Sequence, residues 1–139
     1  MKILALFACL AALGATPAAN SQNNSADWTG VWQATLEGQP GMVLTLSDDS
    51  GELGGTVVFN GLSQETHTIV ATETHLLLHP HLDAGTLTFQ IKKHGNEMNT
   101  GTRSFTLVFT STGKLQSRCT DCGPDSPATE LTRITYPRR

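Results

Sequence analysis

The sequence has few charged residues and no excess of basic ones. Charged residues make up 15% of the 139 residues, and the formal net charge is −3. A typical soluble domain carries about 25% charged residues, and proteins that bind nucleic acid present a strongly basic face. The composition therefore predicts no nucleic-acid partner, and nothing in it identifies a reaction.

Long apolar runs are also missing. A membrane-spanning helix needs about 20 consecutive apolar residues, whereas the longest run here extends only from Ile3 to Leu13. It follows Lys2 and leads into small residues through Ala19, an order typical of a secretory signal peptide. We therefore expect residues 1–19 to be a signal peptide and the chain to be exported to the periplasm or the extracellular space, with no transmembrane segment.

Two details of this leader stay open. Cleavage could follow Gly14, Ala18 or Ala19. Lipidation at Cys9 is a minor alternative, because Phe7 stands where a lipoprotein signal carries a small residue.

The segment after the leader is polar and has almost nothing to bury. Residues 20–27 read Asn-Ser-Gln-Asn-Asn-Ser-Ala-Asp, and such a composition predicts a disordered tether. Residues 28–137 have the length of one ordinary domain. We therefore expect a single domain over this range.

No stretch of this domain has the periodicity of a substantial helix. Apolar and polar residues alternate instead, most clearly over 86–92, where Leu87, Phe89 and Ile91 share one face. Short strands separated by turn signals are typical of antiparallel sandwiches and barrels. Short connections favour a meander, and closing the sheet removes its exposed edges. We predict an all-β fold, an up-and-down meander of about eight or nine strands in a closed or nearly closed barrel.

Four local signals predict where these strands break. Gly38-Gln39-Pro40-Gly41 should end the first strand, and Pro80 should stop the strand over 75–79. Asn60-Gly61 predicts a tight turn, because both residues tolerate positive φ. The pair Gly54-Gly55 inside the third strand, expected over 53–59, indicates a bulge or a sharp bend.

Residues near the two ends of the domain resemble the lipocalin superfamily. Gly30-Val31-Trp32 lies on the first strand, and Arg133 lies on the last, in Leu131-Thr132-Arg133-Ile134. In lipocalins, a G-x-W tryptophan and an arginine from the last strand pack together at the closed end of the barrel. The resemblance implies that Trp32 and Arg133 form a structural closing pair, and a guanidinium over an indole gains roughly 0.5–2 kcal/mol. The Trp-x-Gly-x-Trp strand also resembles that of small secreted bacterial proteins, a likeness that implies no activity.

The two cysteines of the domain form a C-x-x-C motif, Cys119-Thr120-Asp121-Cys122. A redox-active dithiol of the thioredoxin type stands at the start of a helix, whereas this motif lies between two expected strands. A disulfide that stiffens a loop is the favoured interpretation in an exported protein. Metal binding and redox activity are the alternatives.

The five histidines offer a second metal hypothesis. His79 and His81 lie on the same side of an extended segment, where two imidazoles could bind zinc or copper, and Cys119 and Cys122 could complete the set. Histidines on polar faces and in turns are the simpler interpretation. We therefore expect no metal and no cofactor, with His79 and His81 as minor candidates.

No catalytic arrangement is recognisable in the sequence. There is no Gly-x-Ser-x-Gly motif, and the pair Asp48-Asp49 falls in an expected turn. The main functional expectation is therefore a barrel that binds a small apolar or amphipathic molecule in its lumen, since small barrels hold either side chains or one ligand. The expected lining consists of Trp28, Leu36, Met42, Leu44, Phe59, Leu78, Phe89, Phe105 and Leu107.

The alternative is an interaction module built on a filled barrel. The polar loops 94–101 and 119–128 would then contact a protein or an envelope component. The identity of a protein partner is not predicted.

Overall fold

The computed structural model describes residues 24–94 and 101–136, and within them the chain forms one short helix and nine strands. The predicted signal peptide and most of loop 94–101 lie outside the described residues. The elements are α1 (Ser25–Trp28), β1 (Gly30–Leu36), β2 (Gln39–Asp49), β3 (Glu52–Leu62), β4 (Ile69–Leu76), β5 (Leu78–Asp83), β6 (Thr86–Lys92), β7 (Thr102–Phe109), β8 (Leu115–Cys119) and β9 (Thr129–Ile134).

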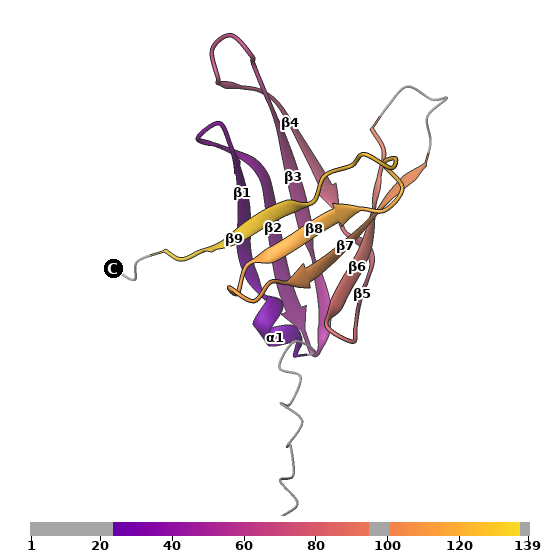
Figure 1. The fold of residues 1–139 in the computed structure, drawn as a ribbon. Coiled ribbons are helices and arrows are strands. Elements are labelled where there is room, and N and C mark those ends of the chain that lie inside the picture. The colour runs from indigo at the N-terminus through magenta and orange to yellow at the C-terminus, as the bar shows by residue number, and fades with distance from the viewer. Residues whose placement is uncertain (1–23, 95–100, 137–139) are drawn as a thin grey trace, which may run out of the picture.

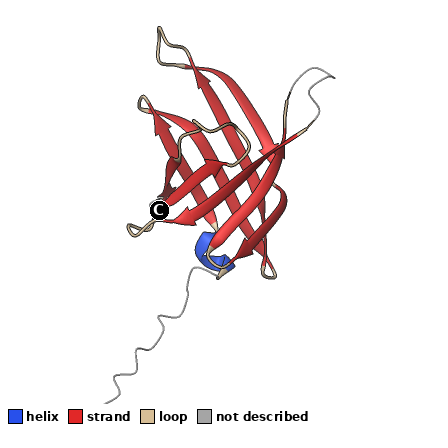
Figure 2. Ribbon diagram, turned by 45° about the vertical axis from the view of Figure 1, so that its right-hand side comes forward, coloured by secondary structure: helices blue, strands red, loops and turns tan. Residues whose placement is uncertain are grey.

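All nine strands belong to one antiparallel sheet that curves into a nearly closed barrel (Figure 1, Figure 2). The order is β4-β3-β2-β1-β9-β8-β7-β6-β5, so every neighbouring pair except β1–β9 is also consecutive in the chain. The predicted all-β meander is confirmed. The pairing of β1 with β9 joins the two ends of the meander, and the sheet stays open between β4 and β5.

The opening lies where one strand runs into the next. Only Leu77 separates β4 from β5. Its backbone N–H donates to the Gly55 carbonyl at 3.1 Å. β4 pairs with β3, whereas β5 pairs with β6. The chain therefore changes its pairing partner from β3 to β6 at Leu77. Across the gap in the sheet, β4 lies next to β6.

Three of the hairpins use two-residue turns in which both residues have positive φ. The pairs are Glu37-Gly38, Ser50-Gly51 and Ala84-Gly85. Such turns match the right-handed twist of the strands, and glycine adopts positive φ without strain. The first strand accordingly ends at Leu36, two residues before Gly38, and β2 already begins at Gln39. The expected break over 38–41 therefore continues beyond the true turn.

The turn prediction at Asn60-Gly61 is wrong. Asn60 and Gly61 lie inside β3, paired with Thr72 and Ala71. The Asn60 amide donates to the Pro40 carbonyl at 2.8 Å and its oxygen accepts from Thr72 Oγ1 at 2.8 Å, so the side chain bridges both neighbouring strands. These hydrogen bonds to two neighbouring strands stabilise the extended conformation at Asn60, where a turn was expected. The chain turns instead over 63–68, where the Ser63 hydroxyl accepts from two backbone N–H groups.

The prediction at Pro80 is also wrong, and that at Gly54-Gly55 needs correction. Pro80 lies within β5, a strand at the end of the sheet, where a register shift between Leu78 and His81 accommodates it. At Gly54 and Gly55 the pairing with β2 continues without a shift, through Ser47 and Leu46. Gly55 is needed there because the backbone of β3 comes close to β2, and it does not form a bulge.

Side chains fill much of the interior of the barrel, and α1 lies at one end of it (Figure 1). Alternate residues of the strands point inward, and Leu44, Val57, Leu87, Leu107, Leu115 and Leu131 are completely buried. Trp28 is buried as well and packs edge-on against Phe109, with ring centroids 4.7 Å apart. Because Trp28 belongs to α1, residues 25–27 are part of the folded domain, which corrects this end of the predicted tether over 20–27.

Candidate functional site: a cavity at the open end of the barrel

The end of the barrel opposite α1 contains a cavity of about 480 Å³. Strands β3, β4, β6 and β7 supply its walls, and the start of the loop after β8 completes them. Its apolar lining comes from Phe59, Ile91 and Phe105. The volume lies within the usual range of roughly 300–1,000 Å³ for small-molecule sites.

A series of five rings leads from the packed core to the rim of this cavity. Phe89 stacks on Phe105 with centroids 5.4 Å apart, and Phe105 stacks on Phe59 at 6.1 Å. Phe59 meets His75 edge-on at 5.9 Å, and His75 stacks on His94 at 4.3 Å. The floor of the cavity is therefore apolar and aromatic, and the surface becomes polar towards its mouth.

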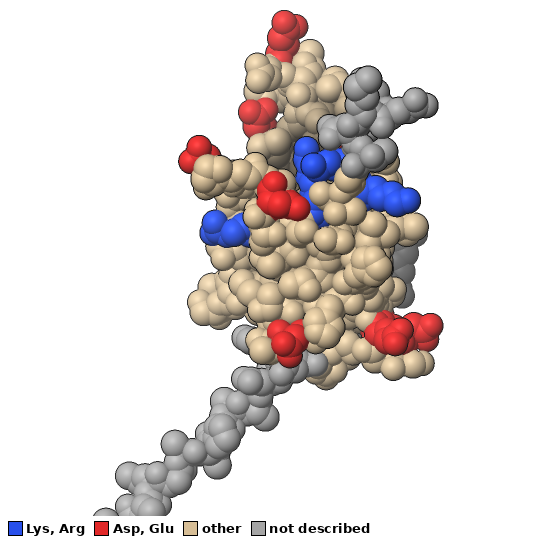
Figure 3. Space-filling model, turned by 90° about the vertical axis from the view of Figure 1, so that its right-hand side faces the viewer, with Lys and Arg blue, Asp and Glu red and all other residues tan. Residues whose placement is uncertain are grey.

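The rim of the cavity carries more positive than negative charge. Among the described residues, Lys92, Lys93 and Arg103 line it, together with one carboxylate, Glu73. The Lys and Arg side chains on the face drawn in Figure 3 lie mainly in its upper half, and acidic residues lie above and below them. The chain as a whole is acidic, so this clustering of cations is local.

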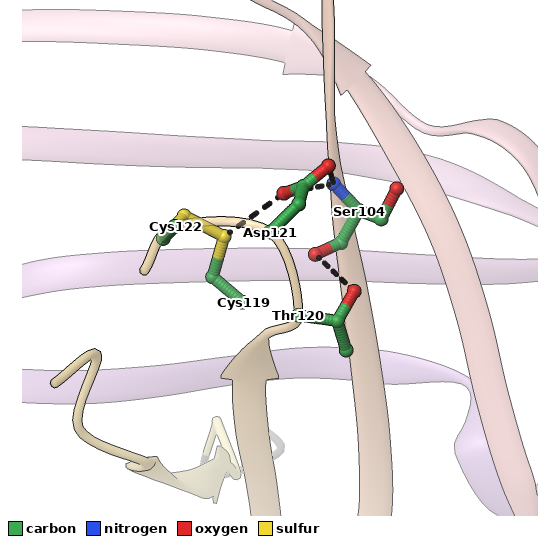
Figure 4. The surroundings of a disulfide bond; sticks show 5 residues. All are labelled: Ser104, Cys119, Thr120, Asp121 and Cys122. Carbon is green, nitrogen blue, oxygen red and sulfur yellow. Dashed lines mark hydrogen bonds between the residues drawn. A yellow bond between two sulfur atoms is a disulfide. The ribbon is translucent and has the colours of Figure 1, made fainter. Parts of the chain in front are cut away.

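The loop after β8 is fastened to the barrel beside the cavity. A disulfide bond joins Cys119 to Cys122, and Cys122 lines the cavity. Asp121 accepts a hydrogen bond from the Ser104 N–H at 3.0 Å, and Thr120 Oγ1 donates to the Ser104 carbonyl at 3.2 Å (Figure 4). With both cysteines bonded to each other, neither thiolate is available for a metal.

The structure places the predicted lining residues in different environments. Phe59 and Phe105 line the cavity, Phe89 lies directly beneath them, and Leu78 lines a smaller neighbouring hollow between β4 and β6. The remaining residues lie elsewhere: Trp28, Leu44, Leu107 and Met42 are buried in the packed core, and Leu36 is 52% exposed. Sequence alternation could identify inward-facing residues, but it could not show which height of the barrel is filled.

The predicted closing pair lies at the side of the barrel where β1 meets β9. Arg133 is opposite Trp32 in the pairing of these strands, and its guanidinium lies 4.5 Å from the centre of the indole. The same guanidinium donates to the Asp27 carbonyl, and the Trp32 indole N–H donates to the Trp28 carbonyl at 2.9 Å. These contacts hold α1 against the strands, and none involves the cavity.

The two histidines singled out as metal candidates do not meet other ligands. His79 and His81 are exposed on β5, and among the described residues neither belongs to a group of three potential metal ligands. His75 and His94 form such a group with Glu73. This group is hard to predict from the sequence, because Glu73 and His75 lie on β4 whereas His94 follows β6, and these two strands are not consecutive. The spacing Glu73-Thr74-His75 was the available signal, since alternate residues of a strand share a face.

No protein-family model, no curated protein and no solved structure matches this chain. The described residues also contain no helix with the length and apolar character needed to cross a membrane. The barrel and its cavity are therefore the features that bear on the function of this chain.

Proposed function

We propose that the protein is an exported barrel that binds one small amphipathic molecule with an acidic head group at its open end. The observation that carries the proposal is the cavity itself, about 480 Å³ with an aromatic floor and a cationic rim. An apolar portion of the ligand would contact Phe59 and Phe105. A carboxylate or a similar anion would lie near Lys92 and Arg103, which supply charge-assisted hydrogen bonds.

The resemblance to lipocalins supports the same proposal at the level of the fold. Lipocalins are antiparallel barrels that hold apolar ligands at one open end, and the nearly closed antiparallel barrel is compatible with that architecture. The deep interior differs from a spacious lumen because large side chains fill it. The proposed ligand is accordingly short and occupies the mouth of the barrel.

A competition experiment tests this proposal. An environment-sensitive fluorescent dye that reports apolar cavities is bound first and then displaced by decanoate or by decanol. We expect decanoate to compete at least about tenfold more strongly, because charge-assisted hydrogen bonds are worth about 1.5–3 kcal/mol. Lys92→Gln and Arg103→Gln should reduce that preference. Lys114→Gln is the matched control, since Lys114 pairs with Glu130 outside the cavity lining.

Two results would contradict parts of the proposal. If neither compound displaces the dye and neither binds by calorimetry, the cavity does not bind amphipathic molecules. If decanol and decanoate compete equally and the lysine and arginine variants change nothing, the ligand lacks the acidic head group.

The interaction module remains the second candidate. The fastening of loop 119–128 to β7 through Asp121 and Thr120 favours it, because a loop held in place presents a defined surface to a partner. Since Cys122 lines the cavity, shortening the loop only within 123–128 separates the two functions. Loss of a partner in a pull-down with ligand uptake unchanged would support the interaction module.

A further inference from the structure

Three potential metal ligands converge at the rim of the cavity. Glu73 and His75 come from β4, and His94 follows β6 across the gap in the sheet. Glu73 Oε2 lies 3.5 Å from His75 Nε2 and 3.9 Å from His94 Nδ1, and all three ligand atoms lie within 4.8 Å of one another. We propose that Glu73, His75 and His94 bind one divalent transition-metal ion of the zinc class.

The spacing of these atoms suits such an ion. Zinc takes nitrogen and carboxylate ligands at about 2.0–2.2 Å, so two ligand atoms of a tetrahedral site lie about 3.3 Å apart. The two distances from Glu73 Oε2 to the histidine nitrogens, 3.5 Å and 3.9 Å, exceed that value by about 0.2 Å and about 0.6 Å. Two histidines and one carboxylate also form the ligand set of zinc sites that keep a fourth position open.

The burial of the three side chains fits a site with one fixed and two adjustable ligands. The His75 side chain is only 4% exposed, and the Phe59 ring packs against it. Glu73 and His94 are 58% and 56% exposed, so they can move without disturbing the core. His94 stacks on His75 with ring planes 26° apart, and its ring has to turn for both nitrogen lone pairs to meet one ion.

The open side of this group faces the cavity, which all three residues line. Lys92, Lys93 and Arg103 line the same cavity and oppose a bare dication. Their charge favours an ion whose fourth position holds an anion, such as hydroxide or the carboxylate of a small molecule. The metal site does not require the proposed amphipathic ligand, because its three ligands, Glu73, His75 and His94, are side chains of the protein itself.

Zinc titration of untagged, metal-stripped protein tests the inference. Calorimetry under non-reducing conditions keeps Cys119 and Cys122 in their disulfide. We expect one Zn²⁺ per chain, and Co²⁺ in its place should give the visible absorption of a tetrahedral site. His94→Ala and Glu73→Gln should each weaken zinc binding at least about tenfold. Loss of a group that only supports a metal ligand already has an effect of about this size, and loss of a ligand itself should cost at least as much.

His81→Ala is the matched control. His81 is also an exposed strand histidine, but it lies in a separate hollow beside Glu52 and Pro80. Its substitution should leave zinc affinity unchanged. The two test variants alter exposed side chains, so unchanged thermal unfolding of the metal-free proteins will show that folding is intact. Absence of stoichiometric binding, or an equal loss in His81→Ala and His94→Ala, would overturn the inference, whatever the outcome with decanoate.

Discussion

Gly55 lies so close to the neighbouring strand that no side chain fits at its position. Its φ is +157°, and a Cβ atom built there would be 1.9 Å from the Thr45 carbonyl oxygen. Gly54, the preceding residue, has no atom within 4 Å of the corresponding position. The sequence indicated that this glycine pair has a structural role, but two adjacent glycines look alike until the opposing strand is placed.

This contrast gives a prediction at the scale of one residue. Gly55→Ala should lower the free energy of unfolding by at least about 2 kcal/mol, because the clash is with backbone that cannot rotate away. Gly54→Ala should change it by no more than about 0.5 kcal/mol. Urea unfolding of both variants followed by circular dichroism measures the difference. Equal losses in the two variants would show that the close approach of β3 to β2 is not what requires glycine.

At the scale of elements, the loop between β8 and β9 is held in place by a local disulfide and by hydrogen bonds to a residue of another strand. The disulfide closes a ring between residues only three apart in sequence. The hydrogen bonds of Asp121 and Thr120 to Ser104, by contrast, connect the loop to β7. The sequence predicted the disulfide from compartment and motif. It could not predict the attachment to Ser104, which depends on how β7 and β8 pair.

We therefore expect the disulfide to contribute little to stability by itself. A ring this short removes little conformational entropy from the unfolded chain, so Cys119→Ser/Cys122→Ser should cost no more than about 2 kcal/mol. Asp121→Ala, which removes both carboxylate oxygens that accept from the Ser104 N–H, should cost about 0.5–1.5 kcal/mol. Thermal unfolding with and without reductant compares them. A loss of folding in the double cysteine variant would show that the disulfide, and not the hydrogen bonds, holds the loop.

At the scale of the whole molecule, the sheet has two ends, β4 and β5, that are consecutive in the chain. β1 is paired on both sides, with β2 and with β9, whereas within the part of the chain that the structure describes β4 pairs only with β3. The gap beside β4 is also where Glu73 and His75 approach His94. The open part of the sheet and the candidate site therefore coincide.

Hydrogen exchange should reveal this asymmetry. Backbone amides of β4 that do not face β3 should exchange at least about tenfold faster than those of β1, because edge strands open with a lower free energy. Exchange measured residue by residue by NMR makes the comparison. If the zinc site exists, saturating Zn²⁺ should slow exchange in β4 and leave β1 unchanged. Equal protection of β4 and β1 without metal would mean that the sheet is closed in solution.

The sequence by itself determined the β architecture, the alternation of inward-facing residues and the presence of a hairpin turn at Gly38. These features are local, because a period of two residues and an X-Gly pair act within a few residues of the chain. Only the tertiary structure decided that Asn60-Gly61 would be strand and that Glu73, His75 and His94 would meet. Both results depend on register and on which strands become neighbours. The cavity belongs to the same class, since it exists only where large side chains from four strands fail to fill the barrel.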